Sequence, residues 1–313
     1  MNDALPRPQR LVCVGGIPID IVVRTEAVPE RGGDLRAQAV VDRPGGPFTV
    51  LTAAKRLGLP AAYAGGYGEG ARGQQVAAAL RREGIEILRA AKPGADTGFS
   101  LVMVDRDAER TCVSTPGAEA LNTRADVESY APTPGDIVHV TGYDLADPAG
   151  VYLVDRLEQW GAEITVAFDP GPMSASEPPA LDPTLVTRTL ARADVVTVNA
   201  REAVALFGSS EPNVVAQLTR GPWTIVRAGA AGAALLHGGQ IIAVADVPKV
   251  DVLDTTGAGD THIGAFAAGL HAGLDPAGAL QLATDAASLS VREVGPATGP
   301  TRTQIDEFKG LAP

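Results

Sequence analysis

The chain has 313 residues, which is enough to bury a substantial core in one large α/β domain or in two smaller domains. Hydrophobic residues make up 45% and charged residues 20% of the sequence, as in ordinary globular proteins. The formal net charge of −11 argues against nucleic acid or an anionic membrane as the main partner, although one local anion-binding turn would still allow a nucleotide to bind.

The first ten residues are rich in proline and polar side chains and lack the apolar run of a signal peptide. We therefore expect residues 1–10 to form a disordered arm ahead of one domain over 11–313. No later apolar run is long enough to cross a membrane. Cys13 and Cys112 are not part of a spaced set of cysteine and histidine ligands, so no zinc site is predicted and a reducing, cytoplasmic location is expected.

The apolar run 11–14, followed by Gly15 and Gly16, predicts a buried strand that ends in a tight turn. Asp20 follows shortly afterwards, where a strand end would present it and where its carboxylate can cap the turn. Two helix-free stretches, about 18–43 and 97–115, each contain two strand-like runs around a turn and predict hairpins. We expect these hairpins to pair into a small sheet outside the main body.

Between the hairpins, Gly45 and Gly46 lead into a helix that ends at Gly58. Further along, residues 68–73 match the Gly-x-Gly-x-x-Gly pattern of dinucleotide-binding turns. The match lies outside the first strand-turn-helix unit, and Glu86 serves as the ribose-binding acid only if the spacing is loosened. A nicotinamide site is therefore the weaker interpretation of a glycine-rich turn that opens a helix.

The second half alternates strands and helices, which predicts a parallel sheet covered on both faces. Ligands bind at the carboxyl ends of such strands, and several strands here end in polar or glycine-rich segments. These segments are 141–144, 169–172, 199–202 and 227–229. The spacing of Asn199 and Glu202 also fits a helix start that is capped by its own glutamate.

A turn without bulky side chains, Gly257-Ala258-Gly259, lies between Asp254 and Asp260 and precedes an apolar run. The first turn of a helix has free N–H groups and a partial positive charge, so such a turn binds anions. Asp260 beside it is placed to take a proton from an attacking hydroxyl. The alternative is a capped helix in which Asp260 only satisfies backbone N–H groups. His262, in the first helical turn, fits packing better than catalysis.

The order Asp-Thr-x-Gly-Ala-Gly-Asp over 254–260 resembles the C-terminal signature of the ribokinase-like (PfkB) carbohydrate kinases. The segment 45–58 is similar to their N-terminal signature, with Thr49 where the family usually has Asn. The resemblance implies a three-layer α/β/α fold with a mostly parallel sheet and a small β-sheet lid. It also implies ATP-dependent phosphorylation of a hydroxymethyl group on a sugar or sugar-like alcohol. A nucleoside kinase and a catalytically silent sugar sensor of the same fold are the alternatives.

The resemblance further implies a role for each matching residue. Asp260 is the expected general base, and Gly257, Ala258 and Gly259 are the expected anion hole. The expected substrate contacts are Asp20, Gly45, Gly46, Thr49 and Asp144, and the expected ATP contacts are Asn199, Arg227, Gly229, Gly232, Thr256, Gly257, Gly259 and Thr284. Glu202 is expected to hold Mg²⁺ through water, and Asp254 a monovalent cation such as K⁺. Dimerisation through the lid is common in this family, so a homodimer is carried as a hypothesis.

Overall fold

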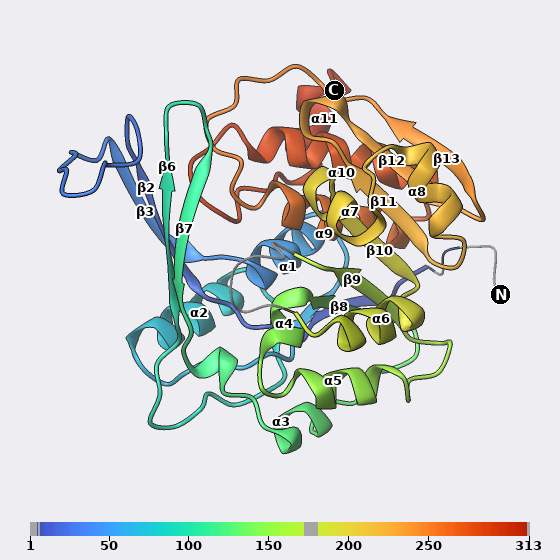
Figure 1. The fold of residues 1–313 in the computed structure, drawn as a ribbon, viewed down its shortest axis with the longest axis horizontal. Coiled ribbons are helices and arrows are strands. Elements are labelled where there is room, and N and C mark those ends of the chain that lie inside the picture. The colour runs from blue at the N-terminus through green and yellow to red at the C-terminus, as the bar shows by residue number, and fades with distance from the viewer. Residues whose placement is uncertain (1–4, 6, 172–180, 312–313) are drawn as a thin grey trace.

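The computed structural model describes residues 5, 7–171 and 181–311 (Figure 1). Within these residues one large sheet contains the strands β1 (Arg10–Cys13), β4 (Ala61–Tyr63), β5 (Glu86–Ile87), β8 (Asp136–Thr141), β9 (Thr165–Asp169), β10 (Val195–Asn199), β11 (Trp223–Arg227), β12 (Ala233–His237) and β13 (Gln240–Ala245). Their spatial order is β13-β12-β11-β10-β9-β8-β1-β4-β5. All neighbours from β11 to β5 run parallel, and only β12 and β13 are antiparallel.

Helices cover both faces of this sheet. One face carries α1 (Pro47–Arg56), α2 (Ala71–Arg82), α9 (Ala258–His271), α10 (Pro276–Ser290) and α11 (Arg302–Phe308). The other carries α3 (Arg124–Glu128), α4 (Gly142–Ala146), α5 (Gly150–Leu157), α6 (Pro183–Arg192), α7 (Ala200–Phe207) and α8 (Pro212–Leu218). Side chains of a strand alternate between faces, so Leu11 and Cys13 enter the first core while Val12 enters the second. In the described part of the chain no helix combines the length and apolar character that a membrane span requires.

The two predicted hairpins form a second sheet, which we call the lid sheet. It consists of β2 (Ile19–Arg24), β3 (Ala39–Pro44), β6 (Phe99–Val104) and β7 (Arg110–Thr115), in the order β3-β2-β6-β7. The hairpins β2–β3 and β6–β7 are antiparallel, and β2 and β6 pair in parallel (Figure 1). Val22, Val102 and Val104 form a small core of their own on the face that meets Val294. The predicted α/β/α fold with a small β lid is confirmed.

The expectation of a disordered arm is wrong for residues 7–10. The Arg7 Nε–H donates to the carbonyl oxygen of His271 at 2.6 Å, and Arg10 opens β1. Arg10 Nη2 also lies 2.8 Å from Asp136 Oδ2. A proline-rich polar segment can thus be held by hydrogen bonds although it contributes little to an apolar core. Residues 1–4 and 6 lie outside the described part of the chain.

The glycine-rich turn at 68–73 serves close packing. The backbone N–H groups of Gly73 and Arg72 donate to the Asp96 carboxylate at 3.0 and 3.4 Å. A Cβ atom on Gly70 would overlap the same carboxylate, and one on Gly68 would overlap the backbone of Asp96. The start of α2 is therefore already occupied by a protein carboxylate, which leaves no place for the pyrophosphate of a dinucleotide.

Candidate active site

Polar side chains meet at the carboxyl edge of the large sheet. β9 ends at Asp169, β10 ends at Asn199 and β11 ends at Arg227, with Asn199 in register with Arg227. Arg227 Nη2 lies 3.1 Å from Asp169 Oδ2 and 3.6 Å from Glu202 Oε2. The sequence patterns predicted no role for Asp169. Its position at the end of a buried strand could have indicated that it belongs to the site. The predicted strand end 169–172 is described as far as Gly171, so Pro172 lies outside the described residues.

Asn199 and Glu202 form the capping box that their spacing allowed. The Glu202 N–H donates to Asn199 Oδ1 at 3.0 Å, and the Asn199 N–H donates to Glu202 Oε2 at 2.7 Å. Burial raises the pKa of the Glu202 carboxyl, the Asp169 charge raises it further, and Arg227 opposes the shift. The start of α7 is thus a rigid unit that presents one carboxylate next to Arg227.

The turn that opens α9 keeps backbone N–H groups free. Gly257 has a φ of 75°, a left-handed conformation that favours glycine, and it directly precedes the helix. Among the described residues, the N–H groups of Gly257, Gly259 and Asp260 have no hydrogen-bond acceptor. A Cβ atom on Gly259 would overlap the Arg227 guanidinium, so this turn lies directly beside the carboxyl edge of β11. The helix start and the strand ends therefore face one common space.

Asp260 lies in the first turn of α9 and is half-buried. Burial and the nearby Asp169 carboxylate raise its pKa to about 7, while Arg110 and Arg227 oppose this shift. A carboxylate with a pKa near neutrality is well matched to proton transfer at neutral pH. Asp260 therefore has the proton affinity that a general base requires.

Asp20 lies near the same space, close enough for the charge of Asp260 to act on it. It is buried, and burial together with the Asp260 charge raises its pKa to about 7. The backbone of Gly45 packs so closely that a Cβ atom there would overlap the Asp20 carboxylate. Gly46, with a φ of 51°, then turns the chain into α1. Residues from both ends of the sequence thus surround one pair of acidic groups.

Thr49 and Asp254 complete the surroundings of the α9 turn. The Thr49 hydroxyl is buried and has no hydrogen-bond partner within the described ranges, and a Cβ atom on Gly257 would lie 3.0 Å from Thr49 Cγ2. The Asp254 carboxylate accepts the N–H of Thr256 and the N–H of Gly295, each at 2.8 Å. Asp254 therefore fastens the turn to the loop that follows α10.

Asp144 occupies a different position from the other predicted substrate contacts. Its Oδ2 accepts the N–H and the hydroxyl of Thr141 at 2.7 and 3.0 Å, as the capping box of α4. Its carboxylate packs against Gly15 and lines a cavity together with Arg89 and Asn122. In this position Asp144 supports the turn after β1.

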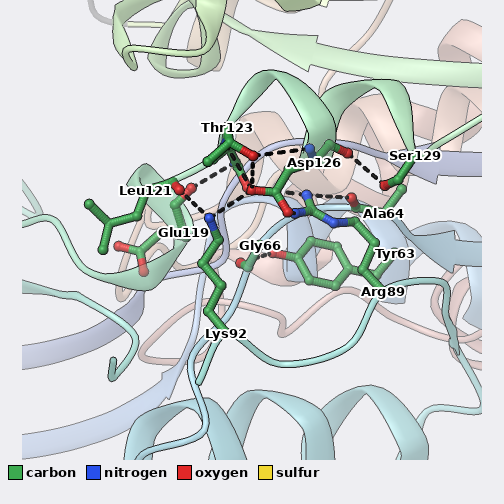
Figure 2. Close-up of polar contacts among 11 residues, drawn as sticks. Tyr63, Ala64, Gly66, Arg89, Lys92, Glu119, Leu121, Thr123, Asp126 and Ser129 are labelled. Atoms are coloured by element: carbon green, nitrogen blue, oxygen red, sulfur yellow. Dashed lines mark hydrogen bonds and ion pairs between the residues drawn. The ribbon is translucent and has the colours of Figure 1, made fainter. Parts of the chain in front are cut away.

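Another wall of that cavity carries a polar cluster in which Arg89 and Lys92 pair with Asp126. Arg89 Nη2 lies 2.6 Å from Asp126 Oδ1, and Lys92 Nζ lies 2.8 Å from Asp126 Oδ2 (Figure 2). Asp126 also accepts the N–H and the hydroxyl of Thr123, each at 2.8 Å. The cluster therefore fastens α3 to the segment after β5 and leaves no unpaired charge at Asp126.

Two of the predicted nucleotide contacts point into the protein. The buried Thr284 hydroxyl donates to the carbonyl oxygen of Leu280 at 3.0 Å and lies 3.4 Å from His262 Nε2. Burial, aided by the Arg227 charge, lowers the pKa of His262 to about 3, so this histidine is a neutral packing residue. The Cα of Gly232 faces the carbonyl oxygen of Ala245, whereas Gly229 lies in an exposed turn after β11. The positions of Thr284 and Gly232 give no support to a nucleotide contact.

The acidic groups of the site fit a hydrated metal ion. In the described part of the chain no group of three or more His, Cys, Asp or Glu side chains could hold a metal directly. Mg²⁺ keeps several of its waters and is usually bound by one or two carboxylates together with substrate phosphates. Glu202 and Asp169 supply two carboxylates beside the free N–H groups of the α9 turn.

Comparisons with known proteins show the family of this chain. A family model described as pfkB family carbohydrate kinase matches residues 8–304. The chain is 32% identical over 305 residues to the uncharacterized sugar kinase YegV of Escherichia coli (strain K12), covering 95% of this chain and 93% of that protein.

Two solved structures extend the comparison. The structure of Arabidopsis thaliana ribokinase complexed with ribose and ATP has a TM-score of 0.73 at 25% identity, covering 97% of this chain and 99% of that one. Fructokinase from Vibrio cholerae O395, in its fructose, ADP and calcium ion bound form, has a TM-score of 0.80 at 23% identity, with coverages of 97% and 99%. The predicted enzyme class, an ATP-dependent carbohydrate kinase, is confirmed. The chain belongs to the pfkB family of carbohydrate kinases.

Proposed function

We propose that this enzyme transfers the γ-phosphoryl group of ATP to a hydroxymethyl group of a sugar or sugar-like alcohol, with Asp260 as the general base. One observation carries the proposal. Asp260, with its pKa raised to about 7, lies directly beside the free N–H groups of the α9 turn and close enough to Asp20 to raise its pKa. A base for the hydroxyl and donors for the phosphoryl oxygens are thereby side by side.

The transfer uses positioning and charge more than covalent chemistry. Asp260 takes the hydroxyl proton while the oxygen attacks the γ-phosphorus, and ADP leaves with the bridging oxygen. The N–H groups of Gly257, Gly259 and Asp260 bind the charge that develops on the transferred group, with Ala258 as part of the same turn. Because these donors are part of the helix start, they need no rearrangement at the moment of reaction.

The nucleotide binds along the carboxyl edge in this proposal. Arg227, Gly229 and Thr256 contact it, and the Asn199–Glu202 unit orients its phosphates and the water shell of Mg²⁺, which supplies further charge neutralisation. Asp254, whose carboxylate is buried and linked to two N–H groups, holds a monovalent cation at the loop after α10. Gly232 and Thr284 contribute through packing.

The acceptor binds between the lid sheet and the start of α1. Asp20 accepts hydrogen bonds from its hydroxyl groups, and the backbone of Gly45 and Gly46 allows close approach. The buried Thr49 hydroxyl is available for one further contact. Asp144 acts indirectly, by holding the turn after β1. A cytoplasmic location, where ATP is abundant, is part of the same proposal.

The outer face of the lid sheet supports a homodimer. Ile21, Leu101 and Val113 are in register across three strands, and Val23 and Met103 form the adjacent row. Val113 on this face is 61% exposed. Soluble proteins rarely leave such rows of a sheet uncovered. We therefore include pairing of two lid sheets in the proposal.

The test is a kinase assay with a panel of sugars, sugar derivatives and nucleosides, run on the wild type and on Asp260→Asn. We expect ATP-dependent phosphorylation of at least one sugar-like acceptor. Asp260→Asn should lower kcat by about 10²- to 10⁴-fold, the usual contribution of a general base. ATP affinity, measured by calorimetry, should stay within about twofold because the N–H donors remain.

The exposed Asp246 provides the matched control, since Asp246→Asn makes the same chemical change outside the site. Its turnover should equal that of the wild type. A preference for nucleosides would select the alternative acceptor class. Absence of transfer to every acceptor, or full turnover by Asp260→Asn, would remove the proposed reaction.

A further inference from the structure

One arginine of the lid sheet faces the acceptor side of the site. Asp20 on β2 pairs with Ser100 on β6, and Ser100 pairs with Ser114 on β7. Successive side chains of a strand alternate between its two faces. Arg110 lies four positions before Ser114 on the same strand, so it shares the face of Asp20. The lid therefore places a cation and the proposed sugar-binding carboxylate on one surface.

The hairpin that carries Arg110 is docked on the signature turn. The Thr255 hydroxyl donates to the carbonyl oxygen of Ala108 at 3.4 Å, which links the tip of the β6–β7 hairpin to the segment before α9. Ala108 has a φ of 60°, an uncommon value for a residue with a side chain, and it turns the chain back towards β7. Arg110 follows two residues later, so it begins β7 close to the segment that leads into α9.

The charge of Arg110 has no fixed partner in the described part of the chain. Arg106, on the same hairpin, lies 3.7 Å from Glu26 Oε1 and 3.8 Å from Asp107 Oδ2, and Arg227 is paired at the carboxyl edge. For Arg110 no hydrogen bond or ion pair of the guanidinium is found among these residues. Arg110 is exposed in this structure, so a ligand that covers its guanidinium must replace the hydrogen bonds of its water.

The electrostatics agree with this placement. Burial raises the pKa values of Asp20, Asp260 and Glu202, and the charge of Arg110 opposes the shift at all three. One lid cation thus acts on both sides of the site, although it is not in ion-pair contact with any of these carboxylates.

The phosphoryl side already has its positive groups, namely Arg227 and the N–H groups of the α9 turn. Arg110 lies instead on the face of the lid sheet that carries Asp20, the proposed acceptor contact. Resting on the proposed function, we infer that the acceptor carries an anionic group, a carboxylate or a phosphate, and that this group binds Arg110 while the hydroxymethyl group at the other end faces Asp260. Guanidinium and either anion can form two parallel hydrogen bonds, which gives both affinity and orientation.

The row of Asp20 fits the hydroxyl groups of such a molecule, and Val102 and Cys112 separate this row from Arg110 on the same face. Ser100 Oγ and Ser114 Oγ lie 2.8 Å apart on the face that carries Asp20 and Arg110. Hydroxyl groups both donate and accept, so this pair can exchange hydrogen bonds with sugar hydroxyls. The substrate class is therefore a sugar acid or a sugar monophosphate with a free hydroxymethyl group.

The experiment measures kcat and KM separately for neutral sugars, sugar acids and sugar monophosphates, with ADP formation as the readout. For the wild type, one anionic class should have a kcat/KM at least about tenfold above its neutral counterparts, as expected for a hydrogen-bonded ion pair. Arg110→Gln should lower kcat/KM for that acceptor by about 10- to 100-fold, mainly through KM, and should change neutral acceptors by less than about threefold. Arg110→Lys should recover part of the loss.

Arg106→Gln is the matched control, because it removes an arginine of the same hairpin that already has partners. It should leave the preference for anionic acceptors unchanged. The sugar acid and sugar monophosphate arms decide which anion is bound.

Two results would overturn the inference while the proposed function stands. The first is a wild-type kcat/KM that is higher for neutral sugars than for anionic acceptors. The second is equal losses for neutral and anionic acceptors in Arg110→Gln, which would assign Arg110 to the transferred phosphoryl group. The wild-type ranking decides the matter even if the variant does not fold. Failure of the proposed function looks different, since Asp260→Asn would then retain turnover.

Discussion

At the residue scale, burial and neighbouring charges set the proton affinity of the proposed base. Asp260 and Asp20 each have a pKa near 7. Burial and the negative charge of nearby carboxylates both disfavour the ionised form of each side chain. Arg227 and Arg110 keep the pKa of Asp260 from rising further. The site therefore contains more acidic groups than basic ones, and their combined charge places the pKa of the proposed base, Asp260, near physiological pH.

This balance predicts the pH dependence of the enzyme. Asp260 accepts a proton only when it is ionised, so kcat/KM should rise with pH through about 7 and then level off. Asp169→Asn removes the carboxylate that helps to raise this pKa, so its profile should move to lower pH. Initial rates across pH 5 to 9, measured for both proteins, check the prediction. An unchanged profile in Asp169→Asn would contradict the coupling.

Stability gives a second readout of the same shift. A pKa raised on folding means that the folded protein binds the proton more tightly, so stability is lost as pH rises through about 7. Asp260→Asn cannot ionise and should lose less thermal stability than the wild type between pH 5 and pH 8.

At the element scale, the start of α9 depends on a carboxylate outside the helix. Asp254 accepts one N–H before the helix and another from the loop after α10. Both hydrogen bonds are buried, and together they hold the N–H donors of the turn against Thr49 and the loop at Pro296. The turn that we propose binds the phosphoryl group is therefore positioned by a connection between two segments that are distant in sequence.

Asp254→Asn should break half of this connection. The amide can accept one of the two N–H groups, but its own NH₂ group would face the other, which leaves a buried donor unpaired. We expect a loss of about 1–3 kcal/mol in the free energy of unfolding, together with a loss of activation by K⁺. Chemical denaturation and rates at varied K⁺ measure the two effects. Asp251→Asn, an exposed change nearby, should show neither. Wild-type behaviour of Asp254→Asn would contradict both roles.

At the scale of the whole molecule, the lid sheet has two chemically different faces. The inner face carries Asp20 and Arg110 towards the large sheet, and the outer face carries the apolar rows around Val113. A lid that pairs with a second copy would be stiffened from outside while it covers a substrate from inside. Acceptor binding and assembly would then depend on the same four strands.

Val113→Lys tests the assembly. A charge on β7, at the edge of the outer face, should be costly to bury between two lid sheets, so the variant should be monomeric at concentrations where the wild type is a dimer. Sedimentation analysis over a range of concentrations measures this. Val244→Lys changes an equally exposed valine on β13, far from the lid sheet, and should remain dimeric. A monomeric wild type at tens of micromolar would contradict the dimer.

Local patterns predicted much of this architecture. Alternation of strands and helices predicted the parallel sheet, and turn residues between apolar runs predicted the hairpins. The spacing of Asn199 and Glu202 predicted a capping box that is present. The prediction of a disordered arm was wrong at Arg7 and Arg10, because hydrogen bonds to distant residues order that segment. No local pattern reports such bonds.

Sequence alone determined the elements, the signature turn at Gly257 and the family resemblance, because each of these depends on residues that are neighbours in the chain. Only the tertiary structure decided which charged side chains lie close enough to influence one another. Asp20, Asp169 and Asp260 come from three distant segments, and Arg110 joins them through the register of the lid strands. Proton affinity and charge pairing depend on burial and on distance in space, and neither quantity is encoded in a local run of residues.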